Sequence, residues 1–407
     1  MSDLSEILAA LRRNGVGAVL IAAQIALTVM IVCNSLSIIQ QRLDRAKRPS
    51  GVDEANLFTI DNRWVGPPSE RSARLQSDLT ALRALSGVID VTATYNVPLR
   101  AGGENGWVTM KPDQQPVTAW NGTYYVDDHA LNTFGARLDT GRWFTAADLG
   151  FVPTPEQKFP GVAVVTRSLA NALYPSGNAL GKSFYYANFP MRIIGIVDRF
   201  EASLMPLGFG EAFFENSLFV PQFPLLGGAD MTYVVRARPG ERDAVMSSAT
   251  KTLLAVNRAR VIKKVQTFSD IRSEAYRGAR GLSLMLGTVS VLLVIVTALG
   301  IVGLTSYWVG QRKRQIGVRR ALGACRTDIL RYFHTENLVI AGCGAVAGVL
   351  MALILNAHVI SGLQVAPMSP AFAAAGAMIL FALSQAAVFW PAWRAASLPP
   401  AIAARGA

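Results

Sequence analysis

The chain has 407 residues, of which 51% are hydrophobic and 16% are charged, and its formal net charge is +12. Soluble domains carry roughly a quarter charged residues, so this composition and a mean hydropathy of +0.31 favour a membrane protein. The positive charge alone suits nucleic-acid binding, but no zinc-finger spacing and no interleaving of aromatic with basic residues accompanies it, which argues against nucleic acid as a partner. The three cysteines are too few and too scattered for a disulfide framework.

Four apolar runs are long enough to cross a bilayer, which takes about 20 helical residues. Buried helices of a soluble core are the alternative, but four such runs without charges favour membrane spans. The first run ends near residue 39, and it is too long for a signal peptide and lacks a clear cleavage site. We predict an N-terminal tail and first span within residues 1–41, followed by spans at 282–310, 333–357 and 370–392.

The long segment between the first and second spans, residues 42–281, alternates strand and helix patterns. Residues 57–98 have the order strand, helix, strand, and residues 230–267 repeat it. These two arms flank an inserted stretch, residues 99–229, that is rich in glycine, proline and aromatics. We expect the arms to pack as one split α+β subdomain, with the insertion as a second.

Within the insertion, the stretch YPSGNALGKSF, Tyr174 to Phe184, resembles a phosphate-binding loop at first sight. Such a loop needs two glycines that bracket four residues before Lys and Ser or Thr, but Gly177 and Gly181 bracket only three. Strand patterns follow this stretch instead of a helix. We therefore interpret it as a turn that leads into a hairpin, in which Gly181 supplies a backbone angle that other residues resist.

No catalytic set and no metal site is predicted. His129, His334 and His358 are far apart in sequence, so they do not suggest a metal site. Asp127 and Asp128 are adjacent, so they point to different sides of an element, and we interpret them as the start of a helix.

Six aromatic residues of the insertion have two interpretations. They line a substrate groove or fill a core, and the second is the commoner fate of such residues. The six are Trp107, Trp120, Tyr124, Tyr125, Trp143 and Tyr185.

Charge predicts the orientation in the membrane. Residues 311–333 hold seven basic residues against one acid, Asp328, whereas the connection between the third and fourth spans, near residues 358–370, carries no charge. Short cationic loops stay in the cytoplasm, so we expect both termini and the loop 311–332 inside and residues 42–281 outside. The basic residues that follow the first span disagree with this rule, but long translocated domains tolerate such charges.

The segment QRKRQIGVRRALGACRTDILRYFHTENLVIAGCGAVAGVLMALIL, residues 311–355, resembles the signature of FtsX-like ABC transporter permeases. The ending PAWRAASLPPAIAAR is similar to the ending of that family. The pieces LDTGRWFTAADLG, VAVVTRSLANALYP, ALGKSF and MRIIGIVDRF resemble MacB-like periplasmic domains, members of the type VII ABC transporter superfamily. One departure is Gln315, where many members carry an acid.

The resemblance implies a fold and an assembly. The fold has one transmembrane helix before and three after a large α+β periplasmic domain, in the inner membrane of a bacterium. Two permease chains, identical or paralogous, assemble with a dimer of cytoplasmic ABC ATPase subunits, and a periplasmic adaptor and an outer-membrane channel are further expected partners. Few residues precede the first span and no true phosphate-binding loop occurs, so we expect ATP and Mg to be bound by the separate ATPase, and no cofactor and no enzymatic activity in this chain.

Residues 311–333 are the predicted docking element for the ATPase. The helical spacing within RQIGVRRALGA, residues 314–324, predicts a helix that Gly323 and Ala324 end before a second helix starts near Thr327, which gives two helices joined by a bend. A positive loop on anionic lipid is the alternative, but lipid needs no fixed apolar pattern. The candidate coupling residues are three that pair with acids of the partner, two apolar anchors and the glycine of the bend: Arg312, Arg314 and Arg319; Ile316 and Leu322; and Gly323.

Two classes of function remain open at this point. The first is efflux of amphipathic peptides, antibiotics or lipids, driven by ATP hydrolysis in the partner and by motion of the periplasmic domain. The second is a mechanotransmission or signalling module that regulates a periplasmic partner, or a permease that releases lipoproteins. The MacB-like domain favours efflux by analogy. We also expect the insertion to contact an adaptor or a hydrophobic cargo.

Overall fold

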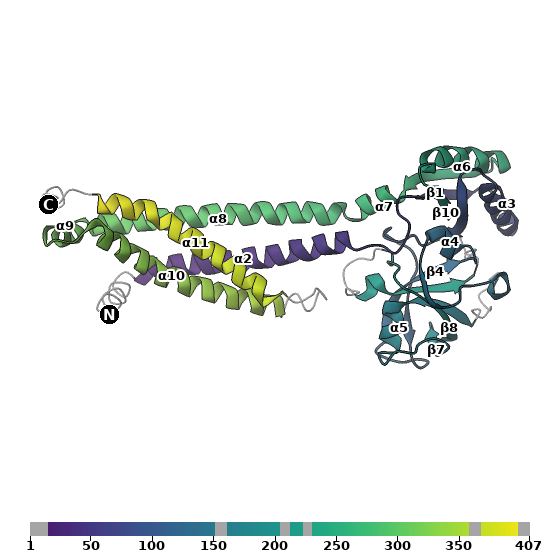
Figure 1. Cartoon of the computed structure of the whole chain (residues 1–407), viewed down its shortest axis with the longest axis horizontal. Coiled ribbons are helices and arrows are strands. Elements are labelled where there is room, and N and C mark those ends of the chain that lie inside the picture. Colours follow the sequence, from purple (N-terminus) through teal and green to yellow (C-terminus); the bar gives the residue numbers. More distant parts are fainter. Residues whose placement is uncertain (1–14, 151–160, 204–211, 223–229, 358–367, 398–407) are drawn as a thin grey trace. The chain divides into compact units, whose positions relative to one another are not determined.

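The structure, a computed structural model, describes residues 15–150, 161–203, 212–222, 230–357 and 368–397 (Figure 1). The chain divides into two compact units. The helical unit comprises Met1–Ala46 and Ala279–Ala407, and the sheet unit comprises Lys47–Gly278.

In its described residues the helical unit contains four long helices and one short helix. The long ones are apolar enough to cross a membrane, so the prediction of one span before the sheet unit and three after it is confirmed. Their bounds are α2 Gly15–Lys47, α8 Arg277–Gln311, α10 Arg326–Leu355 and α11 Pro370–Ala396, and the short helix is α9 Lys313–Ala321.

Small residues let these helices approach closely. On α10, an added Cβ at Gly344 would lie 2.7 Å from the carbonyl oxygen of Ala22, and one at Gly348 would lie 2.6 Å from that of Ala26. These two glycines, four residues apart on one face of α10, allow the backbone of α2 to approach closely. Such a pair of small residues is common where membrane helices pack. Around this contact the buried side chains of all five helices form one continuous core.

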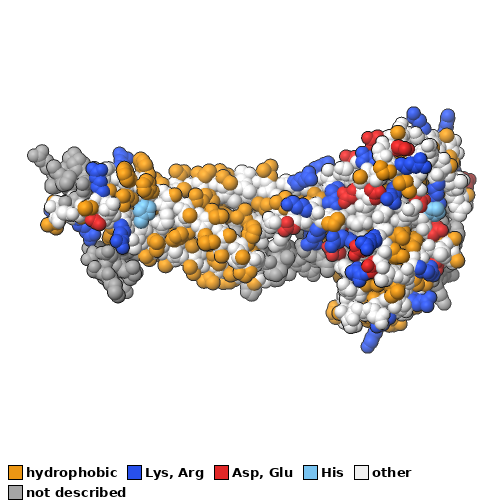
Figure 2. Space-filling view, viewed as in Figure 1, with side chains coloured by type: hydrophobic (Ala, Val, Ile, Leu, Met, Phe, Trp, Pro, Cys, Tyr) orange, Lys and Arg blue, Asp and Glu red, His pale blue; other side chains and the backbone are white. Residues whose placement is uncertain are grey.

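The outer face of the helical unit is apolar. Large hydrophobic side chains of α8, such as Leu284 and Leu299, are more than half exposed. Figure 2 shows hydrophobic side chains along the helices and a group of cations at the end of the bundle where α9 lies in Figure 1. An apolar band that ends in positive charge is typical of a helix bundle in a bilayer.

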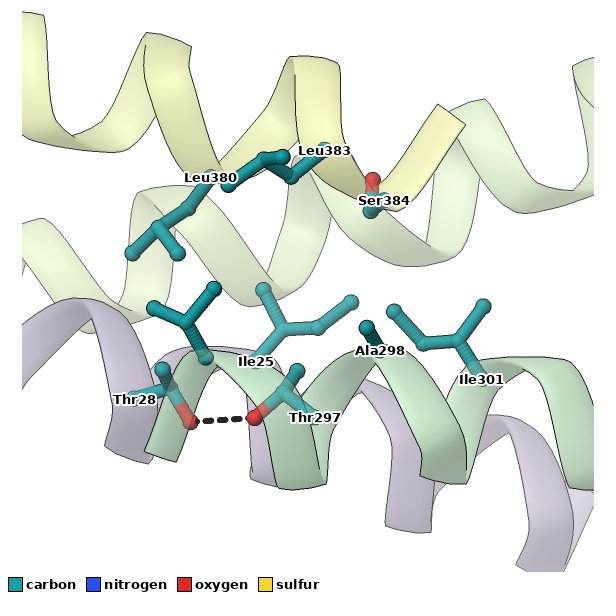
Figure 3. A pocket seen from close by; sticks show the side chains of 9 residues that line it. Ile25, Thr28, Thr297, Ala298, Ile301, Leu380, Leu383 and Ser384 are labelled. Carbon is teal, nitrogen blue, oxygen red and sulfur yellow. Dashed lines mark hydrogen bonds between the residues drawn. The ribbon is translucent and has the colours of Figure 1, made fainter. Parts of the chain in front are cut away.

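Polar side chains inside the bundle join different helices. Gln24 on α2 donates to the carbonyl of Val296 on α8 at 3.2 Å, and the hydroxyls of Thr28 and Thr297 are 2.7 Å apart beside a cavity of about 20 Å³ (Figure 3). Interhelical hydrogen bonding is the role expected for glutamine in a span.

The sheet unit begins with an antiparallel sheet in the order β11-β1-β10-β2, so the two predicted arms share one sheet. Helices α3 and α6 pack together on it, and their leucines enter its core, as at Leu79 and Leu253. A buried ion pair between Asp78 and Arg260, 2.7 Å apart, fixes α3 against β11. The elements are β1 Leu57–Trp64, α3 Arg71–Arg83, β2 Val88–Thr94, β10 Asp230–Ala237, α6 Arg242–Val256 and β11 Arg260–Thr267.

The insertion between the arms forms a second sheet of seven strands in the order β5-β8-β6-β9-β4-β3-β7, and β7 also pairs with β8. Helix α5 covers a core that includes Leu169 and Phe184. The strands are β3 Asn105–Thr109, β4 Ala119–Val126, β5 Leu138–Gly141, β6 Val162–Thr166, β7 Ser183–Tyr186, β8 Phe189–Val197 and β9 Ser217–Pro221, and the helices are α4 Ala130–Phe134, α5 Arg167–Leu173 and the 3₁₀ turn η3 Ala212–Glu215.

Asp127 does not start a helix, so that prediction is wrong. Its carboxylate is buried and accepts hydrogen bonds from Arg83 at 2.8 Å and from the hydroxyl of Thr92 at 2.6 Å, which ties the end of β4 to the first sheet. Helix α4 begins at Ala130 with His129 as its cap residue. The sequence pattern does not identify a partner for Asp127, because Arg83 lies 44 residues away.

Candidate coupling site

The predicted docking element folds as two helices joined by a bend, as expected. Helix α9 ends at Ala321, and Gly323 has a φ of +101°, a left-handed conformation that favours glycine. Helix α10 begins at Arg326, and the backbone N–H of Cys325 donates to the carboxylate of Asp328 at 2.8 Å. We call residues 312–333 the elbow.

Arg312, one of the predicted coupling residues, has an acidic partner in its own chain. Its guanidinium donates to both carboxylate oxygens of Glu336 on α10, at 2.8 and 3.1 Å, and lies 3.4 Å from the hydroxyl of Tyr332. The side chain of Arg312 is 12% exposed and that of Glu336 is 3% exposed. This bidentate pair therefore fastens the break between α8 and α9 to α10.

The side chain of Ile316, predicted as an apolar anchor for the ATPase, is buried in the helical unit. It is 7% exposed and belongs to the core of the helical unit, together with Ile329 and Phe333 of α10. The apolar periodicity of α9 was recognised correctly, but its buried face is covered by the chain's own helices. Ile316 thus holds α9 against α10 instead of reaching outward.

The remaining predicted residues are exposed. Leu322 is 84% exposed and Arg314 is exposed, and Val318 between them on the same helix face is 53% exposed. Arg319 is also exposed, and its guanidinium lies 5.3 Å from the centre of the Tyr332 ring. We define the elbow surface as six exposed side chains of α9, the bend and the first residue of α10: Lys313, Arg314, Val318, Arg319, Leu322 and Arg326.

A cavity of about 100 Å³ lies between α9 and the start of α10. Polar groups of Gln315, Arg319 and Asp328 line it together with the apolar side chains of Ile316 and Ile329. It has the mixed character of a pocket for a side chain of another protein. Sequence reasoning missed Glu336 and Tyr332, although a glutamate at the start of an apolar helix was a signal for a buried partner.

The Gly-Lys-Ser stretch is the turn that the sequence predicted. Gly177 and Gly181 both have a φ of +80°, and β7 and β8 follow as a hairpin. The ammonium of Lys182 lies 4.9 Å from the centre of the Tyr174 ring.

The six aromatic residues fall into two groups. Tyr124 and Tyr125 are buried in the sheet unit, and Trp143 packs on Phe219 at 5.3 Å between ring centres. Trp107 and Trp120 stand opposite each other on β3 and β4, 5.8 Å apart and about 40% and 38% exposed. The core interpretation therefore holds for the first three, whereas the tryptophan pair is half on the surface and Tyr185 on β7 is half-buried.

The polar residues of the spans behave in two ways. Gln385 on α11 lies 3.2 Å from His334 on α10, so it joins two helices in the same manner as Gln24. Asn34 instead donates to the carbonyl oxygen of Met30 in its own helix. In the described ranges no group of three or more His, Cys, Asp or Glu side chains is placed to hold a metal ion, and His358 lies outside them.

Four candidate spans, an α+β unit inserted after the first, and a cationic elbow between the second and third define a multi-pass membrane permease. Residues 18–252, more than half of the chain, match the family described as the MacB-like periplasmic core domain, and residues 287–400 match the FtsX-like permease C-terminal family. The chain belongs to the family of MacB-like permeases with an FtsX-like C-terminal region.

Two relatives illustrate the likeness. The pyoverdine export ATP-binding/permease protein PvdT of Pseudomonas savastanoi pv. phaseolicola is 29% identical over 358 residues, which are 86% of this chain and 51% of the relative. The macrolide export ATP-binding/permease protein MacB of Marinobacter nauticus is 26% identical over 402 residues, 92% of this chain and 57% of the relative. The chain thus spans about half the length of these relatives.

A solved structure is also similar. The periplasmic region of MacB from Actinobacillus actinomycetemcomitans is 19% identical, with a TM-score of 0.35, and the match covers 55% of this chain and 94% of that structure.

Proposed function

We propose that this chain is the permease of an ABC exporter in the bacterial inner membrane, and that a separate cytoplasmic subunit binds and hydrolyses ATP. The two relatives are named as ATP-binding/permease proteins for export. The termini and elbow of this chain lie in the cytoplasm, and the sheet unit lies outside, in the orientation that the positive charge of the elbow favours.

The observation that carries this proposal is the two-sided construction of α9. One side is fastened to the helical unit through Arg312, Glu336 and the buried Ile316. The other side presents the elbow surface, on which Val318 and Leu322 are the exposed apolar residues. A moving ATPase that pushes on the elbow surface therefore also moves α10, because the Arg312–Glu336 ion pair and the packed side chain of Ile316 join α9 to α10.

The cargo in this proposal is an amphipathic peptide, an antibiotic or a lipid, and the two relatives are named for export of pyoverdine and of macrolides. In this mechanism the cargo does not cross the membrane through the bundle, and the cavity beside Thr28 and Thr297 among the described helices, about 20 Å³, gives it no room there. Motion of the helices then acts on the sheet unit, where an adaptor protein and a second permease chain complete the exporter.

The proposal is tested by co-purifying the permease with its ATPase from a membrane that contains both. Leu322→Asp should release the ATPase or uncouple its hydrolysis from transport, because it places a charge at the most exposed apolar residue of the elbow. Thr327→Asp is the matched control: it adds the same charge at an exposed position of the elbow, in the first turn of α10, where a helix accepts an acid.

Docking and lipid binding give different outcomes in this pair. If the elbow only lies on anionic lipid, each variant weakens membrane contact by the same loss of about 1 kcal/mol per charge, and both behave alike. If it docks the ATPase, only Leu322→Asp loses the partner. Full retention of the ATPase and full transport in Leu322→Asp would overturn the proposal.

A further inference from the structure

The chain enters and leaves the sheet unit through two segments, residues 47–54 and 268–278, which we call the neck. An ion pair joins them. Arg272 donates from Nε and Nη2 to the carboxylate of Glu54 at 2.7 and 2.6 Å, and Nη2 also donates to the carbonyl oxygen of Arg48 at 3.0 Å. The first segment of the neck is thus held by α7 (Phe268–Ala275) of the second.

A third segment, residues 199–201, lies against the neck. The backbone N–H of Glu201 donates to the carbonyl of Ser50 at 2.9 Å, and the hydroxyl of Ser50 donates to Glu54 at 2.5 Å. Gly51 has a φ of +84°, and a Cβ there would lie 2.1 Å from the carbonyl oxygen of Arg199. The backbone of the neck therefore touches this segment with no room for a side chain between them.

Glu201 brings an acid into this contact. Its side chain is 3% exposed, and its Oε2 atom has no hydrogen-bond partner among the residues that the structure describes. The hydroxyl of Tyr124 on β4 donates to the backbone carbonyl of Glu201 at 2.9 Å, so it holds the main chain and not the carboxyl group. An ionised carboxylate in such a place is costly, because neither water nor a full set of donors compensates its charge.

Two basic and two acidic groups surround Glu201, and they come from both neck segments and from η3. Burial raises the pKa of the Glu201 carboxyl to about 7 from its ordinary 4.5; Arg272 and Arg48 oppose this shift, and Glu54 and Glu215 add to it. Arg272 is already engaged by Glu54, so its charge stabilises an ionised Glu201 only in competition with that pair.

We propose that Glu201 is a proton-binding site that locks the neck: the closed neck holds its carboxyl group protonated, and opening the neck releases the proton. Opening means that the pair of Glu54 with Arg272 separates and that water reaches Glu201. The ligand of this site is a proton from the solution that surrounds the sheet unit. The inference concerns the sheet unit alone and stands independently of ATPase docking at the elbow.

The direction of the pH effect follows from linkage. In the open neck the pKa of Glu201 returns toward 4.5, and in the closed neck it is about 7. The closed state therefore binds the extra proton. The contribution of this proton to the stability of the closed neck is complete below pH 4.5 and is lost as the pH rises through about 7. One linked proton changes the ratio of closed to open neck by about tenfold between pH 6 and pH 8.

Amide hydrogen exchange of the full-length chain in lipid nanodiscs tests this inference. After correction for the intrinsic exchange rate, the opening ratio of residues 48–54 and 268–276 should rise about tenfold from pH 6 to pH 8. Glu201→Gln, which keeps the shape and removes the titration, should abolish the rise. Glu274→Gln is the matched control, because Glu274 lies on α7 but pairs with Lys264 at 2.9 Å and is half exposed.

A second measurement covers the case in which Glu201→Gln does not fold. Infrared difference spectra of the wild-type chain should show a protonated carboxyl group that ionises with a midpoint near pH 7. Glu54→Gln should move that midpoint downward, because it removes a neighbouring negative charge and frees Arg272. Equal pH dependence in Glu201→Gln and wild type, or a midpoint that Glu54→Gln leaves in place, would overturn the inference.

Discussion

The ion pair at the elbow gives the sharpest prediction for stability. Glu336→Gln removes one charge of a pair in which Arg312 is 12% exposed and Glu336 is 3% exposed, and it leaves the guanidinium buried without a counter-charge. Loss of one member of a buried pair costs about 3–5 kcal/mol, whereas an exposed pair contributes about 0–1 kcal/mol. Both side chains are buried and are joined by two hydrogen bonds of 2.8 and 3.1 Å, so this pair belongs with the buried pairs. We expect a loss of about 3–5 kcal/mol in the free energy of unfolding.

The assay is denaturant unfolding of the permease in detergent, followed by tryptophan fluorescence. The double variant Arg312→Met/Glu336→Leu should recover most of the loss, because apolar side chains of similar size replace a buried pair at little cost. Arg314→Ala is the control, because Arg314 is exposed two residues away and should change the free energy by less than about 0.5 kcal/mol. A loss below about 1 kcal/mol in Glu336→Gln would show that water screens the pair and would refute the reasoning.

Three further predictions follow from the fold. Gly348→Leu should destabilise the bundle by about 1–3 kcal/mol in the same assay, because its Cβ would lie 2.6 Å from the carbonyl oxygen of Ala26, whereas Gly342→Leu faces open space and should be tolerated. Lys182→Ala should leave binding of a fluorescent ATP analogue to the complete exporter unchanged, and a loss of binding contradicts our interpretation of the Gly-Lys-Ser stretch. In a cysteine-free background, Arg326→Cys should react with a membrane-impermeant thiol reagent only from the cytoplasmic face, and labelling from outside contradicts the predicted orientation.

Local rules predicted the parts of this structure that depend on local chemistry. Apolar runs predicted the four spans, and the strand and helix patterns predicted two arms that share one sheet. Gly181 and Gly323 were assigned to turns, and both have a positive φ. In each case the residue type restricts its own backbone or its own face, so no knowledge of distant partners is needed.

Contacts between distant residues were beyond these rules. The partner of Arg312 lies 24 residues further along the chain and on another helix, and that of Asp127 lies 44 residues back. A single residue, Tyr276, with a φ of −98° and a ψ of 4°, separates α7 from α8.

The elbow shows why a cationic loop is a poor guide to which of its charges meet a partner. An arginine next to a membrane helix has two ways to compensate its charge, an acid of its own chain or an acid of another protein, and the sequence pattern is the same for both. Arg312 has the first and Arg314 remains exposed, although both belong to one run of three basic residues. Burial separates them: the residue that is fixed inside determines how α9 is held, and the residue that stays outside is available for recognition. A search for ATPase contacts should therefore begin with Arg314, Val318 and Leu322, and a variant of Arg312 that loses coupling should first be checked for a displaced α9.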